Sequence, residues 1–184
     1  MPRLFIAIDM PDALRGKICE LRRNLPGVRW TEREQIHLTL SFIGDANEEN
    51  FQRIRESLDA VKFRRFCIEM NSCGFFPNAR RPSVFWLGCA ESPKLSALKN
   101  DIDDILELNG LPRETRRFTP HITVARLKDV QQKEVSKLEG MFKDMLPQEF
   151  PVDGFILYSS ALTANGAIHS REKSYLSENN SCPA

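Results

Sequence analysis

The sequence predicts an α+β protein made of two similar halves. Short apolar runs that are typical of buried strands alternate with segments whose apolar residues recur at helical spacing. The order strand–helix–strand–helix–strand occurs twice, and each copy has a His-x-Thr motif in its second strand. We therefore expect a single domain over residues 1–176, with duplicated halves at about 1–78 and 82–160.

The first half shows a local signal for each of its elements. The expected elements are a buried strand at Leu4–Ile8, a helix between Pro11 and Pro26, an alternating strand at Ile36–Ile43, a helix beginning after Asn47 and a strand at Phe66–Phe76. Pro11 suits the first turn of a helix, because the N–H that proline lacks would have no helical partner there. Asn47 is followed by two glutamates, which is typical of a helix N-terminus.

The second half repeats this order. The expected elements are a buried strand at Val84–Cys89, a helix from Ser92-Pro93 to Asn109-Gly110, a strand at Thr119–Leu127, a helix with Val135, Leu138, Phe142 and Met145 facing inward, and a strand at Phe150–Ser160. Ser92 and Pro93 form an N-cap followed by proline at the first helical position, and Gly110 is a typical residue after a helix end. The polar tail at 177–184 is expected to be disordered.

Composition narrows the class of protein. Hydrophobic residues make up 41% of the chain and charged residues 28%, as in ordinary globular proteins. No apolar run approaches the roughly 18 residues of a membrane span, and the N-terminus becomes acidic too early for a signal peptide. The five cysteines are scattered and lack a Cys-x-x-Cys motif, so we expect reduced thiols and a cytoplasmic protein. The net charge of +1 points to no particular partner.

Two of the three histidines occur in matching strands. His37 is followed by Leu38 and Thr39, and His121 by Ile122 and Thr123. Since alternate residues of a strand share a face, each histidine lies on the same face as its threonine, and Ser41 shares the face of His37 and Thr39. The apolar residues lie on the other face. If a two-fold axis relates the halves, both polar faces meet across one cleft.

Two facing imidazoles suit acid–base chemistry on a phosphate ester. Near neutral pH one can be neutral and accept a proton while the other is protonated and donates one. The threonine hydroxyls can donate hydrogen bonds to phosphate oxygens, so this chemistry needs no metal. Two alternatives are a pair of structural histidines and a zinc site. Zinc normally requires a third protein ligand, and no Asp, Glu or Cys lies on either His-x-Thr face.

These motifs and their flanking residues resemble a known family. The chain is similar to LigT-like RNA 2′,3′-cyclic phosphodiesterases, the bacterial group once called 2′-5′ RNA ligases, within the two-histidine phosphoesterases. The segments that carry the resemblance are RLFIAID (Arg3–Asp9), VRW (Val28–Trp30), HLTLSFIG (His37–Gly44), FPNARRPSVFWLG (Phe76–Gly88), FTPHITVAR (Phe118–Arg126) and LYSSALTANGA (Leu157–Ala167). They cover nearly the whole chain in the family order.

The resemblance implies both a fold and an activity. The implied fold is bilobal and pseudo-two-fold, with two antiparallel sheets facing a V-shaped cleft and helices packed outside. The implied reaction opens a 2′,3′-cyclic phosphate at an RNA end, tRNA fragments included, to a 2′-phosphate without a cofactor, with reversible 2′-5′ ligation by the same chemistry. His37 would be the proton donor and His121 the proton acceptor. Thr39, Thr123 and Arg126 would bind the phosphate, and the protein would act as a monomer.

Three residues near the motifs raise questions of position. Strict alternation puts Arg126, five residues after His121, on the opposite face unless the strand bulges. Phe42 stands at the same offset from His37, and we expect it in the core. His169 occupies a place where the family commonly has an aromatic residue, and we expect it at the surface, where the rim of the cleft is one possible position.

Other functions stay open at this stage. The alternatives are a phosphodiesterase for small cyclic nucleotides or 2′-5′ oligoadenylates and a non-catalytic module that binds RNA ends. Paired arginines at 22–23, 64–65, 80–81 and 116–117 could form a local patch for a phosphate polymer or could be solvated loop charges. Trp30 and Phe118 precede the two motifs and could stack on a base or simply pack.

Overall fold

The computed structural model describes residues 3–163 and 166–178. The strands in this part of the chain are β1 (Arg3–Asp9), β2 (Val28–Trp30), β3 (His37–Asp45), β4 (Phe66–Phe76), β5 (Val84–Cys89), β6 (His121–Leu127), β7 (Gln148–Val152), β8 (Gly154–Thr163) and β9 (Gly166–Leu176). The helices are α1 (Asp12–Glu20), α2 (Glu48–Ser57), α3 (Pro93–Leu108) and α4 (Gln132–Lys143), with short 3₁₀ turns at Arg33–Gln35 and Leu58–Ala60. The predicted α+β class is confirmed.

The strands form one antiparallel sheet in the order β7-β4-β5-β6-β3-β1-β8-β9. The two strand sets expected as separate sheets join where Leu38 of β3 pairs with Ile122 of β6. From Ala125 onward, β2 replaces β3 as the neighbour of β6. Each half of the chain also contributes a strand to the other half's part of the sheet. Strand β4 of the first half pairs with β5 and β7 of the second half, and β8 of the second half pairs with β1 of the first half.

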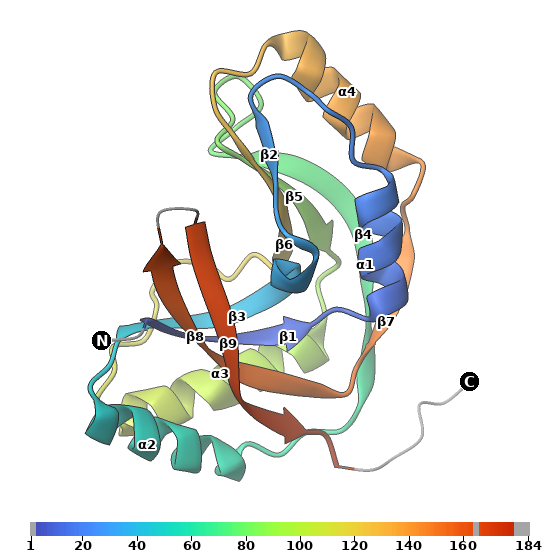
Figure 1. The fold of residues 1–184 in the computed structure, drawn as a ribbon. Helices are drawn as coiled ribbons and strands as arrows, with labels where there is room; N and C mark the ends of the chain where they lie inside the picture. Colours follow the sequence, from blue (N-terminus) through green and yellow to red (C-terminus); the bar gives the residue numbers. More distant parts are fainter. Residues whose placement is uncertain (1–2, 164–165, 179–184) are drawn as a thin grey trace.

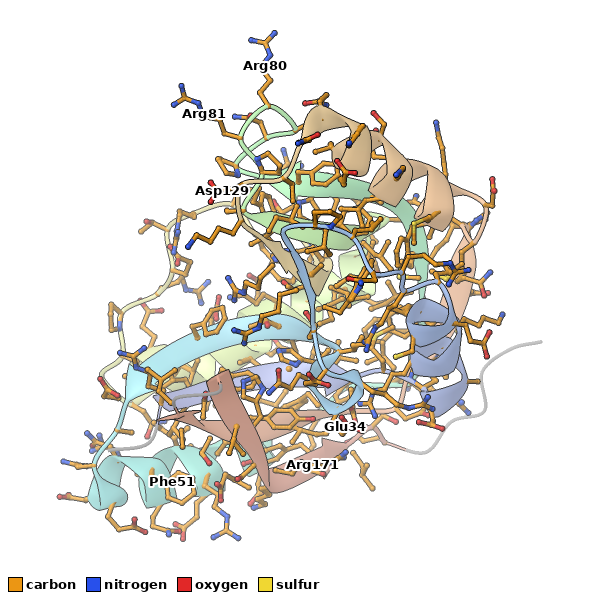
Figure 2. The ribbon with its side chains drawn as sticks, turned by 45° about the horizontal axis from the view of Figure 1, so that its top comes forward. Glu34, Phe51, Arg80, Arg81, Asp129 and Arg171 are labelled. Carbon is orange, nitrogen blue, oxygen red and sulfur yellow. The ribbon has the colours of Figure 1, made fainter. Side chains whose placement is uncertain are left out.

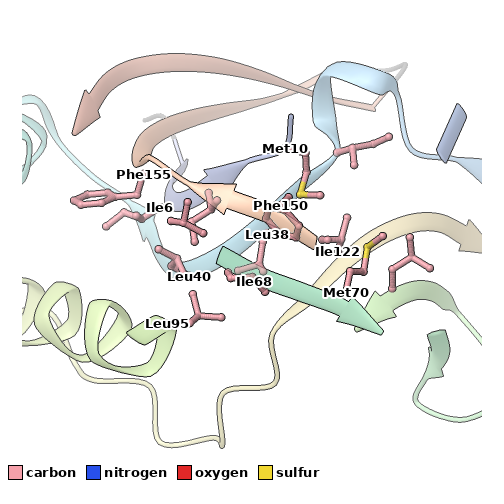
Figure 3. Packing of buried hydrophobic residues seen from close by; sticks show 14 of the residues in the cluster. Ile6, Met10, Leu38, Leu40, Ile68, Met70, Leu95, Ile122, Phe150 and Phe155 are labelled. Carbon is pink, nitrogen blue, oxygen red and sulfur yellow. The ribbon is translucent and has the colours of Figure 1, made fainter. Parts of the chain in front are cut away.

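The main hydrophobic core lies on one face of this sheet. Leu4, Ile6 and Ile8 alternate along β1 into the core, and all four helices bury their apolar residues in the same cluster. The helices therefore lie on the outside of the curved sheet (Figure 1), and Figure 3 shows part of the core beneath them. Phe5 and Ala7 point to the opposite face, which we call the site face.

Several local expectations differ from the structure. The strand predicted at Phe150–Ser160 is divided at Asp153 into β7 and β8, which pair with different neighbours. Strands β2 and β9 were not predicted, because β2 is only three residues long and β9 is largely polar. In the tail that was expected to be disordered, the amides of Ser177 and Glu178 donate to the carbonyls of Asp153 and Phe63. The remaining tail, 179–184, lies outside the described residues.

Two further expectations concern the class of protein. Cys19, Cys73 and Cys89 are free thiols, as predicted, and Cys182 lies outside the described residues. Burial raises the pKa of the Cys89 thiol to about 12. In the part of the chain that the structure describes, no helix is long and apolar enough to span a membrane.

Candidate active site

The two histidine strands share the same irregularity. In β3, one extra residue separates the pairs Thr39–Ala7 and Ser41–Ile6, and in β6 one extra residue separates Thr123–Trp86 and Ala125–Phe85. Such a β-bulge inverts the alternation of the side chains beyond it. Two successive residues are consequently buried in each strand, and the next residue is exposed.

The bulges decide which residues after the motifs reach the site face. Arg126 is exposed on the face that carries His121 and Thr123, so the bulge considered from the sequence is present. Phe42 is 80% exposed and contacts the Phe5 ring, so the prediction that Phe42 lies in the core is wrong. Ser41, which strict alternation placed beside His37 and Thr39, is instead buried, and its hydroxyl donates to Asp103 of α3 at 2.9 Å.

The register of β3 and β6 brings the four motif residues together. Leu38 and Ile122 are directly paired and fully buried. Because the strands are antiparallel, this pair sets Thr39 beside His121 and His37 beside Thr123 on the site face. All four side chains are partly exposed. Each imidazole thus has the other motif's hydroxyl as its neighbour.

His37 lies in an aromatic environment. Its ring stacks on Phe5 with 5.1 Å between centroids and lies 6.0 Å from the Tyr158 ring and 5.6 Å from the His169 ring. Burial, together with the positive charges of His169 and Arg15, lowers the pKa of His37 to about 4, against a smaller raising effect of a hydrogen bond with the Gln35 backbone. The protein without substrate therefore favours a neutral His37.

His121 is oriented by the backbone. Its Nδ1 lies 2.7 Å from the carbonyl oxygen of Thr119. Since a carbonyl oxygen only accepts, Nδ1 carries the proton of this bond, and in the neutral ring Nε2 is left as the proton acceptor. The edge of the Phe76 ring contacts the imidazole at 4.9 Å, and Trp86 lies 6.4 Å away.

Glycine makes room for the aromatic wall behind His121. A Cβ at Gly74 would lie 2.5 Å from Cζ2 of Trp86, and a Cβ at Gly88 would lie 2.8 Å from Cζ3 of the same ring. The indole therefore covers positions on β4 and β5 where only glycine fits. Trp86 in turn packs against Phe76 at 5.2 Å, which holds the ring that contacts His121.

His169, predicted to lie at the surface with the rim of the cleft as one possible position, is partly exposed and lies beside His37. The hairpin of β8 and β9 crosses the start of β3, where the Gln35 side chain donates to the carbonyl of Ala167 and Arg171 forms an ion pair with Asp9. This crossing brings the half-buried His169 ring against Phe5 at 4.9 Å and close to His37. Its Nδ1 is buried and has no hydrogen-bond partner among the described residues.

Sequence reasoning missed most of the aromatic residues on the site face. The alternation of β1 already separates Phe5 from Leu4 and Ile6, and this pattern could have identified Phe5. For Tyr158 and Phe76 no comparable signal exists, because each directly follows another apolar residue, Leu157 in β8 and Phe75 in β4, so the local pattern does not separate the two faces.

The two aromatic residues that precede the motifs pack away from the histidines. Trp30 donates from Nε1 to the carbonyl of Arg23 and its ring lies 6.1 Å from that of Phe142. Phe118 is partly buried against the core, with Nζ of Lys99 5.8 Å from its ring centroid. Among the residues that the structure describes, no group of three or more His, Cys, Asp or Glu side chains could hold a metal ion.

Comparison with known proteins identifies the family. The family model described as the 2′-5′ RNA ligase superfamily matches residues 10–163. An RNA 2′,3′-cyclic phosphodiesterase from Archaeoglobus fulgidus is 35% identical over 170 residues, covering 91% of this chain and 96% of the relative. Another from Thermotoga maritima is 34% identical over 173 residues, covering 91% of each protein.

A solved structure shows the same fold. A crystal structure of E. coli LigT complexed with 3′-AMP superimposes with a TM-score of 0.77 at 24% identity, covering 97% of this chain and all of that one. The fold, the extent of the family match and the identity to these relatives agree. The chain belongs to the 2′-5′ RNA ligase superfamily.

Proposed function

We propose that the protein opens 2′,3′-cyclic phosphates at RNA ends to 2′-phosphates. The observation that carries this proposal is the adjacency of two His-x-Thr motifs in one antiparallel register on the site face. The arrangement supplies two proton-transfer groups and two hydroxyl donors around one small volume, which is what hydrolysis of a phosphodiester requires. The relatives at 35% and 34% identity are named RNA 2′,3′-cyclic phosphodiesterases.

In the proposed reaction, His121 is the proton acceptor and His37 the proton donor. Nε2 of His121 takes a proton from water, whose oxygen bonds to phosphorus, while protonated His37 gives its proton to the leaving 3′ oxygen as the P–O3′ bond breaks. The products are a 2′-phosphate and a 3′-hydroxyl. Thr39, Thr123 and Arg126 donate hydrogen bonds to the phosphate oxygens, which carry the negative charge that develops.

The low pKa of His37 fits this assignment only with substrate present. A neutral His37 has no proton to donate, and burial favours that form in the free protein. A bound phosphate stabilises the imidazolium and raises the pKa of His37. Proton uptake by the donor is thereby linked to substrate binding.

The same groups can serve the related ligation. A 5′-hydroxyl of a second RNA takes the place of water, loses its proton to His121 and forms a 2′-5′ phosphodiester as the 3′ oxygen leaves. We further propose that the enzyme acts as a monomer in the cytoplasm on RNA ends that include tRNA fragments. The free thiols of Cys19, Cys73 and Cys89 support a reducing compartment.

Product analysis tests the proposal. An oligonucleotide ending in a 2′,3′-cyclic phosphate should yield the 2′-phosphate in excess chelator, and His121→Ala should serve as the inactive control. Recovery of the 3′-phosphate alone would reverse the orientation of donor and leaving oxygen. Binding without turnover would favour a non-catalytic RNA-end module, and turnover confined to free cyclic nucleotides or 2′-5′ oligoadenylates would favour a small substrate.

A further inference from the structure

Two arginines stand directly opposite each other beyond the histidine motifs. Arg126 of β6 pairs with Arg29 of β2, so both side chains project from the same face of the sheet, and both are exposed. Neither forms an ion pair or side-chain hydrogen bond with another residue in the described part of the chain. Like charges placed directly opposite destabilise an antiparallel pair. The arrangement therefore favours an anion bound between the two guanidinium groups.

Several other exposed arginines have acidic partners. The exposed pairs are Arg3–Asp45, Arg65–Asp153, Arg113–Asp104, Arg116–Glu114 and Arg117–Glu91. These contacts neutralise the positive charge locally, which explains how a chain with a net charge of +1 can keep a basic region.

The β4–β5 loop, residues 77–83, extends the unpaired positive charge. It lies at the same end of the sheet, because Val84 pairs with Arg126 and the amide of Leu127 donates to the carbonyl of Ser83. Within the loop, Oδ1 of Asn78 accepts from the amides of Arg80 and Arg81 at 3.0 and 3.1 Å.

This turn leaves both arginine side chains projecting into solvent (Figure 2). Neither has an ion pair within the described residues, although Asp129 lies in the same region of the molecule.

The part of β3 beyond its histidine motif exposes an aromatic residue where β6 exposes an arginine. The bulge in β6 exposes Arg126, and the corresponding bulge in β3 exposes Phe42 at the matching position. A bound RNA strand that extends away from the histidines therefore passes positive charge if it follows β6 and an aromatic ring if it follows β3. A cyclic phosphate ends an RNA at its 3′ side, so the rest of the strand leaves the site in one direction only.

We propose that Arg29, Arg80 and Arg81, here called the arginine track, bind the backbone phosphates of the RNA that precede its cyclic end. The track begins beside Arg126, which binds the cyclic phosphate itself. This inference rests on the proposed function and adds the substrate class. The enzyme acts on oligonucleotides, which reach the loop at 77–83, in preference to mononucleotides, which do not. Arg126 lies nearest the motifs along β6, and Arg80 and Arg81 lie farthest from them.

The double variant R80A/R81A tests the track without altering the motifs. Its matched control is R116A/R117A, which removes an exposed arginine pair that has acidic partners. The substrates are a nucleoside 2′,3′-cyclic monophosphate and a hexanucleotide with the same cyclic end. In R80A/R81A we expect kcat/KM for the hexanucleotide to fall roughly tenfold and its salt dependence, as a log–log slope, to decrease by about 1.4 for two lost phosphate contacts. Turnover of the monophosphate should not change.

A binding measurement separates failure of the track from failure of the reaction. The affinity for a fluorescent hexanucleotide ending in a 2′-phosphate is measured by anisotropy for the wild type and both double variants. If R80A/R81A binds more weakly than the wild type and R116A/R117A does not, the track is supported, even if no substrate is turned over. Absence of turnover would overturn only the proposed reaction. Equal affinities, or equal losses for hexanucleotide and monophosphate turnover, overturn the track.

Discussion

Folding stability should depend on pH through His37. In the unfolded chain this imidazole has the ordinary pKa of 6.5, whereas burial lowers it to about 4 in the folded protein. Between these values the unfolded state binds a proton that the folded state does not, so the free energy of unfolding falls as the pH falls from about 6.5 to about 4. At about 1.36 kcal/mol per pKa unit, the loss attributable to His37 amounts to about 3 kcal/mol.

The variant His37→Gln isolates this effect, because glutamine does not titrate. Urea unfolding followed by tryptophan fluorescence at pH 7, 5.5 and 4 gives the free energy of unfolding of both proteins. Titration of the other groups is common to the two chains and cancels in the difference. The wild type should lose about 3 kcal/mol more than the variant between pH 7 and pH 4. Parallel stability curves would refute the argument that burial of His37 excludes its charged form.

Other predictions follow from the site. His121→Ala should lower turnover by roughly 10²–10⁴-fold and leave the melting temperature nearly unchanged; unfolding of this variant would indicate a structural histidine. Gly74→Ala drives a Cβ against Trp86 and should lower kcat/KM about tenfold or more by moving the wall behind His121. Gly140→Ala, which meets no atom within 4 Å, is its control. The kcat/KM profile should be bell-shaped, because the reaction needs a neutral acceptor and a protonated donor. Because bound phosphate favours the imidazolium and raises the pKa of His37 from about 4, the limb due to His37 should lie at higher pH in kcat than in kcat/KM.

Local patterns in the sequence were enough to predict most of the elements and the histidine motifs, although β2 and β9 were missed. The alternation in β3 and β6 separates His37 and Thr39 from Leu38, and His121 and Thr123 from Ile122, since side chains of a strand alternate between faces. The caps at Asn47 and Ser92 were also predicted correctly, and both side chains accept from a backbone amide three residues on. Such features depend on neighbours within one turn or one strand.

The tertiary structure decided what surrounds the motifs. A bulge depends on how two strands pair, and strict alternation therefore misplaced Phe42 and Ser41 and left the face of Arg126 open. The crossing of the β8–β9 hairpin brings His169 to His37 from a distant part of the chain. The low pKa of His37 likewise results from burial and from charges on other elements. Sequence determined which chemical groups are present, whereas packing between distant segments determined their neighbours, exposure and protonation, because these depend on contacts that local patterns do not encode.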